Sequence, residues 1–187
     1  MSASMPIVAL TVVSAPPSSF EEAYRDYAQC TARWARHLGG ASVDVEDVVQ
    51  EVFLVVSKRL AAFRPEARFS SWLFEITRKI VANHRRRHRW RFWREERHGE
   101  LSNAPTAVSD PVAELERKQR VAQFYTALDQ LPEKYRTVLV LYEIEGMSTK
   151  AISELCRLNL STLKVQLSRA RERFIKGYQG LLKESES

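Results

Sequence analysis

The sequence predicts an all-α protein of two small helical domains joined by a flexible linker. Apolar residues recur at helical spacing along the chain, and no segment alternates as a strand would. Capping residues precede several of these segments, and glycine or proline follows them. Residues 99–110 have the turn-rich composition of a linker. We therefore expect an N-terminal domain over 19–93, a linker over 94–110, and a C-terminal domain over 111–187 that contains a helix-turn-helix.

The N-terminal domain is expected to begin after a mostly disordered lead-in over residues 1–18. Its first helix should start at a capping box that contains Ser18 or Ser19. It should end near His37, because the Gly39-Gly40 pair follows and glycine readily terminates a helix.

Two further helices are expected in this domain. The second should begin near Asp44 and end at about Phe63, because Pro65 cannot continue it. The third should start after Ser71 and end in a basic tract over 84–97. Its buried face is expected to carry Leu73, Ile76, Thr77 and Ile80.

The C-terminal domain is expected to hold four helices. Asp110 and Pro111 suit the N-cap and first turn of the first helix. Pro132 begins the second, and Gly146 separates the second from the third. The expected bounds are about 111–129, 132–145, 148–157 and 161–179.

Composition favours a polyanionic partner. The 187 residues carry a net charge of +6 with a pI of about 9.5, which suits nucleic acid or a membrane surface. No run reaches the roughly 18 apolar residues of a membrane span, so we expect no membrane insertion and a cytoplasmic protein. Cys30 and Cys156 lack metal-ligand spacing and should be reduced and buried. Without a phosphate loop, a nucleophile motif or a metal-ligand pattern, we expect no catalytic residues, no metal, no cofactor and no enzymatic activity.

Residues 151–171 have the layout of a DNA-binding helix-turn-helix. A short helix over 151–156 precedes a turn over 157–160, and a polar, basic helix follows. The apolar positions expected to face the core are Leu160, Leu163, Leu167, Ala170 and Phe174. The opposite face carries Ser161, Thr162, Lys164, Gln166, Ser168, Arg169, Arg171 and Arg173. Such side chains can contact base edges or phosphates, although an ordinary surface helix with a basic face is the alternative.

Residues 84–94 form a basic tract with interleaved aromatic side chains. The tract holds six arginines in eleven residues. Arginines suit phosphate neutralisation, and aromatic rings can stack on exposed bases. The alternative is a solvated helix end, because the helix dipole favours cations there.

Three carboxylates form a stripe on the expected second helix: Asp44, Asp47 and Glu51. In a protein of positive net charge, this stripe is not expected to face DNA. It is either solvated or docked on a basic protein surface. A magnesium-dependent nuclease centre is a further interpretation, but three acids on one regular helix support it weakly.

In this order, the motifs resemble those of a bacterial RNA polymerase sigma factor of the compact extracytoplasmic-function type. The matching segments are 44–53, 69–78 with 85–87, 131–139 and 161–171, within a resemblance that covers about 19–179. The family pattern commonly has Gly at the positions of Arg157 and Ser161, an acidic residue near Ala151, and Asp at the position of Asn83. Because of these departures, the promoter sequence does not follow from the resemblance.

The resemblance implies a promoter-specificity subunit that binds core RNA polymerase, recognises promoter DNA and helps to melt it. Core binding is implied for Asp47, Gln50, Glu51 and Phe53. Residues 63–72 are implied to capture a flipped base of the −10 element. Contact with that element is implied for Phe69, Trp72, Lys79, Asn83, Arg86 and Arg87. Contact with the −35 element is implied for Ser161, Thr162, Lys164, Gln166, Ser168, Arg169 and Arg173. An anti-sigma factor is the further partner that the family implies.

The alternative function is a free-standing helix-turn-helix regulator. Its N-terminal block would then serve dimerisation or ligand binding. Such a regulator would bind a palindrome as a dimer, without polymerase. The acidic helix and the basic tract favour the sigma factor.

Overall fold

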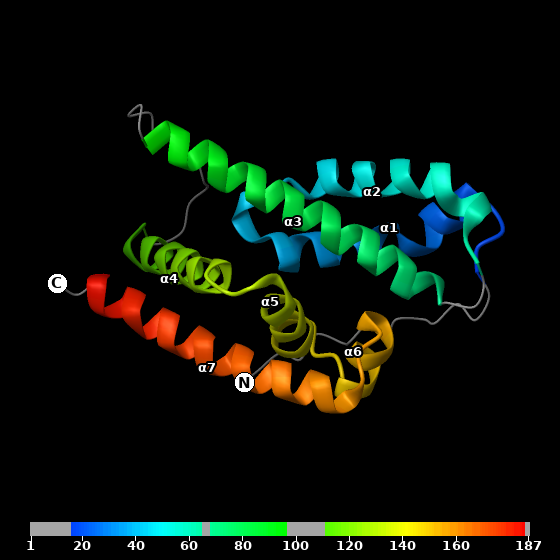
Figure 1. The fold of residues 1–187 in the computed structure, drawn as a ribbon. Helices are drawn as coiled ribbons and strands as arrows, with labels where there is room; N and C mark the ends of the chain where they lie inside the picture. The colour runs from blue at the N-terminus through cyan, green and yellow to red at the C-terminus, as the bar shows by residue number, and fades with distance from the viewer. Residues whose placement is uncertain (1–15, 65–67, 97–110, 186–187) are drawn as a thin grey trace.

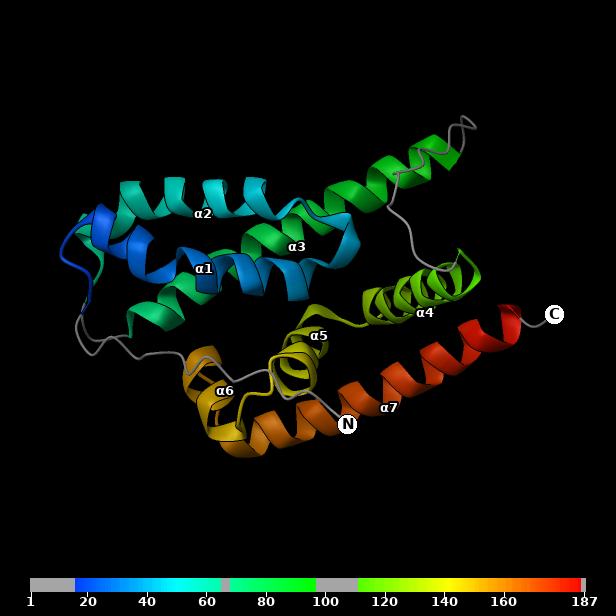
Figure 2. The same cartoon turned by 180° about the vertical axis from the view of Figure 1, so that it is seen from behind.

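A computed structural model describes residues 16–64, 68–96 and 111–185, and the regular elements in these ranges are all helical (Figure 1). The all-α prediction is confirmed. The helices form two groups that lie against each other, α1 to α3 and α4 to α7 (Figures 1 and 2). Most of the expected lead-in and linker lies outside the described residues.

The N-terminal group contains α1 Phe20–Gly39, α2 Val45–Arg59 and α3 Phe69–Glu96, with 3₁₀ turns at Gly40–Ser42 and Leu60–Ala62. The C-terminal group contains α4 Pro111–Asp129, α5 Glu133–Leu139, α6 Thr149–Cys156 and α7 Leu160–Ser185, with a π-helical turn at Val140–Ile144. α3 continues to Glu96, so the helix enters the segment expected to be linker.

Both serines of the expected capping box hold the start of α1. The Ser19 hydroxyl oxygen accepts the Glu22 backbone N–H at 3.2 Å, and the Glu22 carboxylate accepts the Ser18 N–H and hydroxyl, each at 2.8 Å. Gly40 follows the helix with φ of +67°, in the left-handed region. A Cβ at Gly40 would lie 2.5 Å from Cδ1 of Tyr125 in α4. Glycine is therefore required both for the turn and for the approach of α4.

The N-terminal group packs around aromatic and valine side chains. Trp34 of α1 meets Phe74 of α3 edge-on, with ring centroids 5.0 Å apart, and both rings are buried. α2 contributes three fully covered valines: Val48, Val52 and Val56. Their spacing of four residues puts them on one face of the helix. This packing positions α3 so that its exposed side carries the basic tract.

The helix expected over 132–145 is present, but its geometry changes along its length, because α5 gives way to the π-helical turn. The Glu145 N–H donates to the carbonyl of Val140 at 3.0 Å, five residues back. A π turn holds one more residue than an α turn, which lets Val140 and Leu141 stay buried. Glu145 is then directed at α1.

A buried arginine joins the two groups. Arg136 of α5 is fully covered, and its guanidinium donates to the Leu38 carbonyl of α1 at 2.9 and 2.7 Å. Another nitrogen of the same guanidinium donates to Asp129 at 2.9 Å. Burial lowers the pKa of Arg136 to about 10, so the side chain stays charged at neutral pH. The charge is held by partners from both halves of the molecule.

Two further groups of polar contacts lie near Arg136 at the junction. Arg85 of α3 is only 4% exposed, and it donates to Asp129 and to Glu133, each at 2.8 Å. On the other side, the Glu145 carboxylate lies 2.6 Å from Nδ1 of His37 and 2.8 Å from Nε of Arg33. The junction is thus a network of charges that come from distant parts of the sequence.

Cys30 and Cys156 are partly buried free thiols, and burial raises the pKa of each to about 12. Their burial suits the small apolar role that the sequence indicated. Of the helices that the structure describes, none has both the length and the hydropathy to cross a membrane.

Replacing Arg136 with Met should lower the free energy of unfolding by about 3 kcal/mol. Met keeps the length of the side chain but leaves the Leu38 carbonyl without its donor and Asp129 with Arg85 alone. Urea denaturation followed by circular dichroism measures the change. Lys134→Met, on the exposed side of α5, should change it by less than about 0.5 kcal/mol. Equal losses in the two variants would contradict a structural role for the buried charge.

Candidate functional site

The helix-turn-helix has well-defined caps at each of its internal ends. The Ser148 hydroxyl oxygen accepts the Ala151 N–H at 3.2 Å and begins α6. Arg157 ends α6 in the left-handed conformation, with φ of +53°. Oδ1 of Asn159 accepts the Thr162 N–H at 2.7 Å, so α7 begins at Leu160, one residue earlier than expected. The Asn159 cap was missed, although Asn before an apolar helical segment is a recognisable N-cap signal.

α7 buries most of the apolar stripe that the sequence assigned to it. Leu163, Leu167 and Ala170 are buried, and Phe174 is partly buried against Phe124 of α4. The assignment of Leu160 to the core is wrong, because it is 46% exposed. Leu160 is the first residue of the helix and projects beyond the packed region.

The residues implied to contact the −35 element differ in their exposure and in their contacts within the protein. Ser161, Lys164, Ser168, Arg169 and Arg173 are exposed, whereas Thr162 and Gln166 are half-buried. The Arg173 guanidinium lies 5.0 Å from the ring centroid of Tyr135, and hydrogen bonding from Arg169 lowers the pKa of the same Tyr135 hydroxyl. Ser161 donates to Asn159 at 2.9 Å. Lys164 and Ser168 have no such contact among the described residues.

Val165 is a candidate that the sequence reasoning missed. It is 49% exposed on α7, between Lys164 and Gln166. An exposed apolar side chain on a recognition helix can contact a thymine methyl group. Its position on the polar face of the expected helix could have indicated this role.

The −10 candidates lie along α3, and one of them is buried. Phe69 is 4% exposed, with its ring centroid 4.9 Å from that of Tyr27 and 5.4 Å from those of Phe63 and Trp72. The implied direct contact of Phe69 with DNA is therefore not available in this arrangement. Trp72 is half-buried and retains an accessible edge. Phe69 supports the aromatic cluster from beneath.

Further along α3, the basic candidates are exposed. Arg86 donates to Oδ1 of the half-buried Asn83 at 3.3 Å, and Arg87 is exposed. Lys79 is exposed and lies 3.3 Å from Glu75. Trp90 is 76% exposed, which leaves its ring free to stack. Side chains of the tract beyond residue 90 lie outside those described.

The predicted acidic stripe divides into three roles. Asp44 caps α2, because Oδ1 accepts the N–H groups of Glu46 and Asp47 at 2.8 and 3.1 Å. Glu51 lies 2.8 Å from Nε2 of His84 in α3. Asp47 remains exposed, as does its neighbour on the helix, Gln50.

Phe53 does not offer the free surface that a core-binding residue needs. It is 3% exposed, and its ring centroid lies 4.9 Å from that of Tyr24 and 6.2 Å from that of Phe20. Phe20, Tyr24 and Leu54 are exposed apolar side chains beside it. Phe53 therefore packs beneath the surface of α1 and α2.

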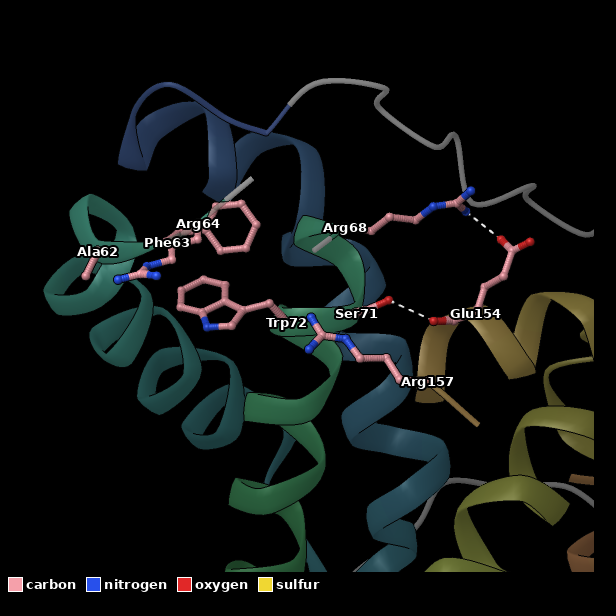
Figure 3. A pocket seen from close by; sticks show the side chains of 8 residues that line it. All are labelled: Ala62, Phe63, Arg64, Arg68, Ser71, Trp72, Glu154 and Arg157. Atoms are coloured by element: carbon pink, nitrogen blue, oxygen red, sulfur yellow. Dashed lines mark hydrogen bonds and ion pairs between the residues drawn. The ribbon is translucent and has the colours of Figure 1, made fainter. Parts of the chain in front are cut away.

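A cavity of about 780 Å³ opens where the two helical groups meet (Figure 3). Its walls are Ala62, Phe63, Arg64, Arg68, Ser71, Trp72, Glu154 and Arg157. α6 contributes Glu154 to this region, and the sequence did not predict it because nothing local indicates which segment α6 approaches. In the described part of the chain, no cluster of three His, Cys, Asp or Glu side chains is placed to hold a metal.

Both helical groups match models of known protein families. The model described as Sigma-70 region 2 matches residues 23–91, and the one described as Sigma-70, region 4 matches residues 121–174. The first match covers most of the three N-terminal helices and extends into the basic tract, and the second covers the helix-turn-helix.

Curated relatives match over most of the chain. The RNA polymerase sigma-H factor of Pseudomonas aeruginosa is 30% identical over 76% of this chain and 77% of its own length. The ECF RNA polymerase sigma factor EcfG of Rhodopseudomonas palustris is 31% identical over 75% of this chain and 74% of its own. The ECF RNA polymerase sigma factor SigE of Mycolicibacterium smegmatis is 30% identical over 82% of this chain, which spans only 59% of that relative.

Two solved structures have a similar fold. CnrH, solved in complex with the cytosolic domain of CnrY, superposes with a TM-score of 0.54 at 26% identity, covering 90% of this chain and 89% of that chain. The sigma factor RpoE of Bartonella quintana, solved with the anti-sigma factor NepR, has a TM-score of 0.54 at 20% identity and covers 86% of this chain and 96% of that chain. The latter bears on the fold alone.

Replacing Arg157 with Gly should raise the free energy of unfolding by about 0.5 to 1 kcal/mol. Glycine adopts the left-handed conformation at this turn without the steric cost that a Cβ carries. Arg157→Ala is the matched control, because it removes the same side chain but keeps the Cβ. Thermal melting followed by circular dichroism measures both. A gain in the alanine variant equal to that in the glycine variant would rule out backbone conformation as the cause.

Proposed function

Because the chain belongs to the RNA polymerase sigma factors, in their extracytoplasmic-function group, we propose that it directs core polymerase to promoters through the surfaces described above. It binds the core enzyme, recognises the −10 and −35 elements and helps to open the promoter. One observation carries this assignment: the matches to regions 2 and 4 fall on the two helical groups that bear the basic α3 and the helix-turn-helix. Residues 19–93 and 111–187 act as the two domains, with 94–110 as the linker.

The exposed part of α2 serves core binding. Asp47 and Gln50 are exposed, and the Glu51 carboxylate beside them is held by His84. The carboxylates of Asp47 and Glu51 suit a basic surface on the large polymerase subunits. Phe53 takes a supporting role, because it is buried under Tyr24.

The aromatic cluster and basic side of α3 serve the −10 element. Trp72 and Phe63 offer rings for an unstacked base, and flipping a base costs a few kcal/mol that such stacking can offset. Lys79, Arg86 and Arg87 lie exposed on the same helix and suit phosphates of the melted strand. Asn83 orients Arg86.

α7 serves the −35 element as the recognition helix of the helix-turn-helix. Its N-terminal turns present Lys164, Val165 and Ser168 to a major groove. Thr162 and Gln166 reach it with their accessible edges. The partners of Ser161, Arg169 and Arg173 within the protein restrict these side chains to phosphate contacts at the rim of the interface.

We further propose an anti-sigma partner and a cytoplasmic site of action, where polymerase and DNA are found. CnrH, which has a similar structure, was solved in complex with a protein partner, the cytosolic domain of CnrY. The protein acts as an initiation factor rather than as an enzyme. The free-standing regulator remains the competing function, but it does not account for the match to region 2.

The deciding experiment mixes the purified chain with core polymerase and transcribes a library of promoter fragments. Specific start sites, together with co-purification of the chain and the core enzyme, are the expected results. Binding to a palindromic site as a dimer, with no recruitment of polymerase, would establish the competing regulator instead.

Asp47→Arg should weaken the binding of core polymerase by about tenfold or more, because it places a cation against a basic surface. Fluorescence anisotropy of the labelled chain titrated with core enzyme measures this affinity. Glu46→Arg is the matched control: it reverses a second exposed carboxylate in the same first turn of α2, about 100° around the helix. A similar loss in both variants would show that general charge, and not the Asp47 face, attracts the polymerase.

Lys164→Ala should reduce the salt slope of −35 binding by about one and leave core binding unchanged. Lys164 is an exposed cation in the first turns of α7. We prefer it to Arg169 because Arg169 also hydrogen-bonds Tyr135, so its loss would disturb the domain itself. Affinity of the holoenzyme for a promoter duplex over a series of salt concentrations gives the slope. Lys176→Ala, three turns further along α7, should leave the slope as it is.

A further inference from the structure

We propose that the cavity lined by α3 and the end of α6 binds a free nucleotide. The base stacks on the rings of Phe63 and Trp72, and the phosphates are held by the arginines of the cavity wall. These arginines are Arg64, Arg68 and Arg157. The site is a small-molecule site, additional to the polymerase and promoter surfaces assigned above.

Arg157 is the residue that points most directly to a ligand. Its φ is +53°, and among the residues that the structure describes it is the only one other than glycine with a positive φ. A Cβ makes this conformation unfavourable, and strained residues of this kind concentrate at binding sites. Figure 3 shows the Arg157 side chain extending from the end of α6 towards Trp72. The strained position therefore presents a guanidinium to the cavity.

The cavity wall carries an excess of positive charge. Arg68 is paired with Glu154 at 2.6 Å, whereas neither Arg64 nor Arg157 has a carboxylate partner among the described residues. Three arginines less one carboxylate leave a net charge of +2. A phosphate monoester carries about −1.5 to −2 at neutral pH. The guanidinium fork binds phosphate oxygens in pairs, so these arginines suit a phosphate group.

The aromatic side of the cavity suits a base. The ring centroids of Phe63 and Trp72 lie 5.2 Å apart, with the ring planes tilted by 52°. Stacked rings are about 3.5 Å apart, so no base fits between these two, and a base stacks instead on the side that faces the cavity. The cavity volume of about 780 Å³ lies within the range of small-molecule sites, about 300 to 1,000 Å³.

A free nucleotide suits this cavity better than a nucleotide within a strand. α6 limits the cavity on one side, where the Ser71 hydroxyl donates to the Glu154 carbonyl at 3.1 Å (Figure 3). A base within a strand brings a neighbouring nucleotide on each side, and both must leave the site. A mononucleotide has no such neighbours, so its phosphates are free to reach Arg64 on one wall and Arg157 on another.

A bound nucleotide excludes the base of the −10 element, and this consequence rests on the function proposed above. Phe63 and Trp72 are the rings assigned to that base. One ring face cannot stack on two bases at once. Free nucleotide and single-stranded −10 DNA therefore compete for the chain.

The test is isothermal titration calorimetry of the full chain with ADP, GDP, CDP and UDP. At least one should bind one to one, with a Kd of about 10 to 100 µM. Pyrophosphate, which lacks the base, should bind at least about tenfold more weakly. Absence of binding by all four nucleotides would overturn the proposal. Pyrophosphate that binds as tightly as the nucleotides would do so too, because the site would then hold an adventitious anion only.

R157G separates loss of the ligand from loss of the fold. It removes the guanidinium while relieving the backbone, so the chain should melt at the same temperature or higher and yet bind the nucleotide about tenfold more weakly. R36A is the matched control, because it removes an exposed arginine of α1 that lies outside the cavity. Equal losses of affinity in R157G and R36A would overturn the site, because net charge alone would then explain the binding.

W72L tests the stacking of the base. It should weaken nucleotide binding by about tenfold and leave pyrophosphate binding unchanged, because it removes a ring and no charge. Nucleotide affinity equal to that of the unaltered chain would overturn the assignment of the base to these rings.

The competition is measured with a labelled single-stranded oligonucleotide from the non-template strand of a promoter identified by the transcription experiment. Saturating nucleotide should weaken its binding to the free chain by about fivefold or more, and should have no such effect on R157G. The same effect in both chains would overturn the competition. A chain that directs no specific transcription would overturn the proposed function but not the nucleotide site, because calorimetry uses the free chain without polymerase.

Discussion

The guanidinium of Arg136 is removed from water and donates to a main-chain carbonyl of α1 while its charge is shared with Asp129 of α4. A buried cation of this kind is tolerated only while its partners surround it. The end of α1, the end of α4 and the start of α5 are therefore fixed relative to one another. The positions of the helix-turn-helix and of the basic face of α3 follow from this one cluster.

Some arginines of the chain stabilise the fold, and others are exposed and free to bind a partner. The composition does not distinguish the two kinds. Arg85 and Arg86 are neighbours in the same tract, yet Arg85 is buried among Asp129 and Glu133 whereas Arg86 is exposed. Consecutive residues of a helix point about 100° apart, so a run of arginines cannot all face one partner. The positive field that attracts DNA thus comes from only part of the net charge.

Local rules predicted the helices well, because caps, glycines and apolar periodicity act within a few residues. Ser19, Gly40 and the valines of α2 are examples. Contacts between distant segments were not predictable from these signals. Nothing near Glu154 indicates that it meets Arg68, 86 residues away, and nothing near Phe53 shows that Tyr24 covers it. The sequence therefore predicted which segments carry the candidate sites. Which side chains of those segments are accessible could be seen only in the fold.

The π-helical turn at Val140–Ile144 makes the length of this segment critical. It amounts to an α-helix with one residue inserted, and each residue of a helix advances by about 100°. Loss of a single residue here would return the segment to α-helical phase and rotate Glu145 away from His37 and Arg33. Chain length at this point is therefore constrained as tightly as residue identity. An insertion or deletion tolerated in most surface turns would here uncouple the helix-turn-helix from the N-terminal helices.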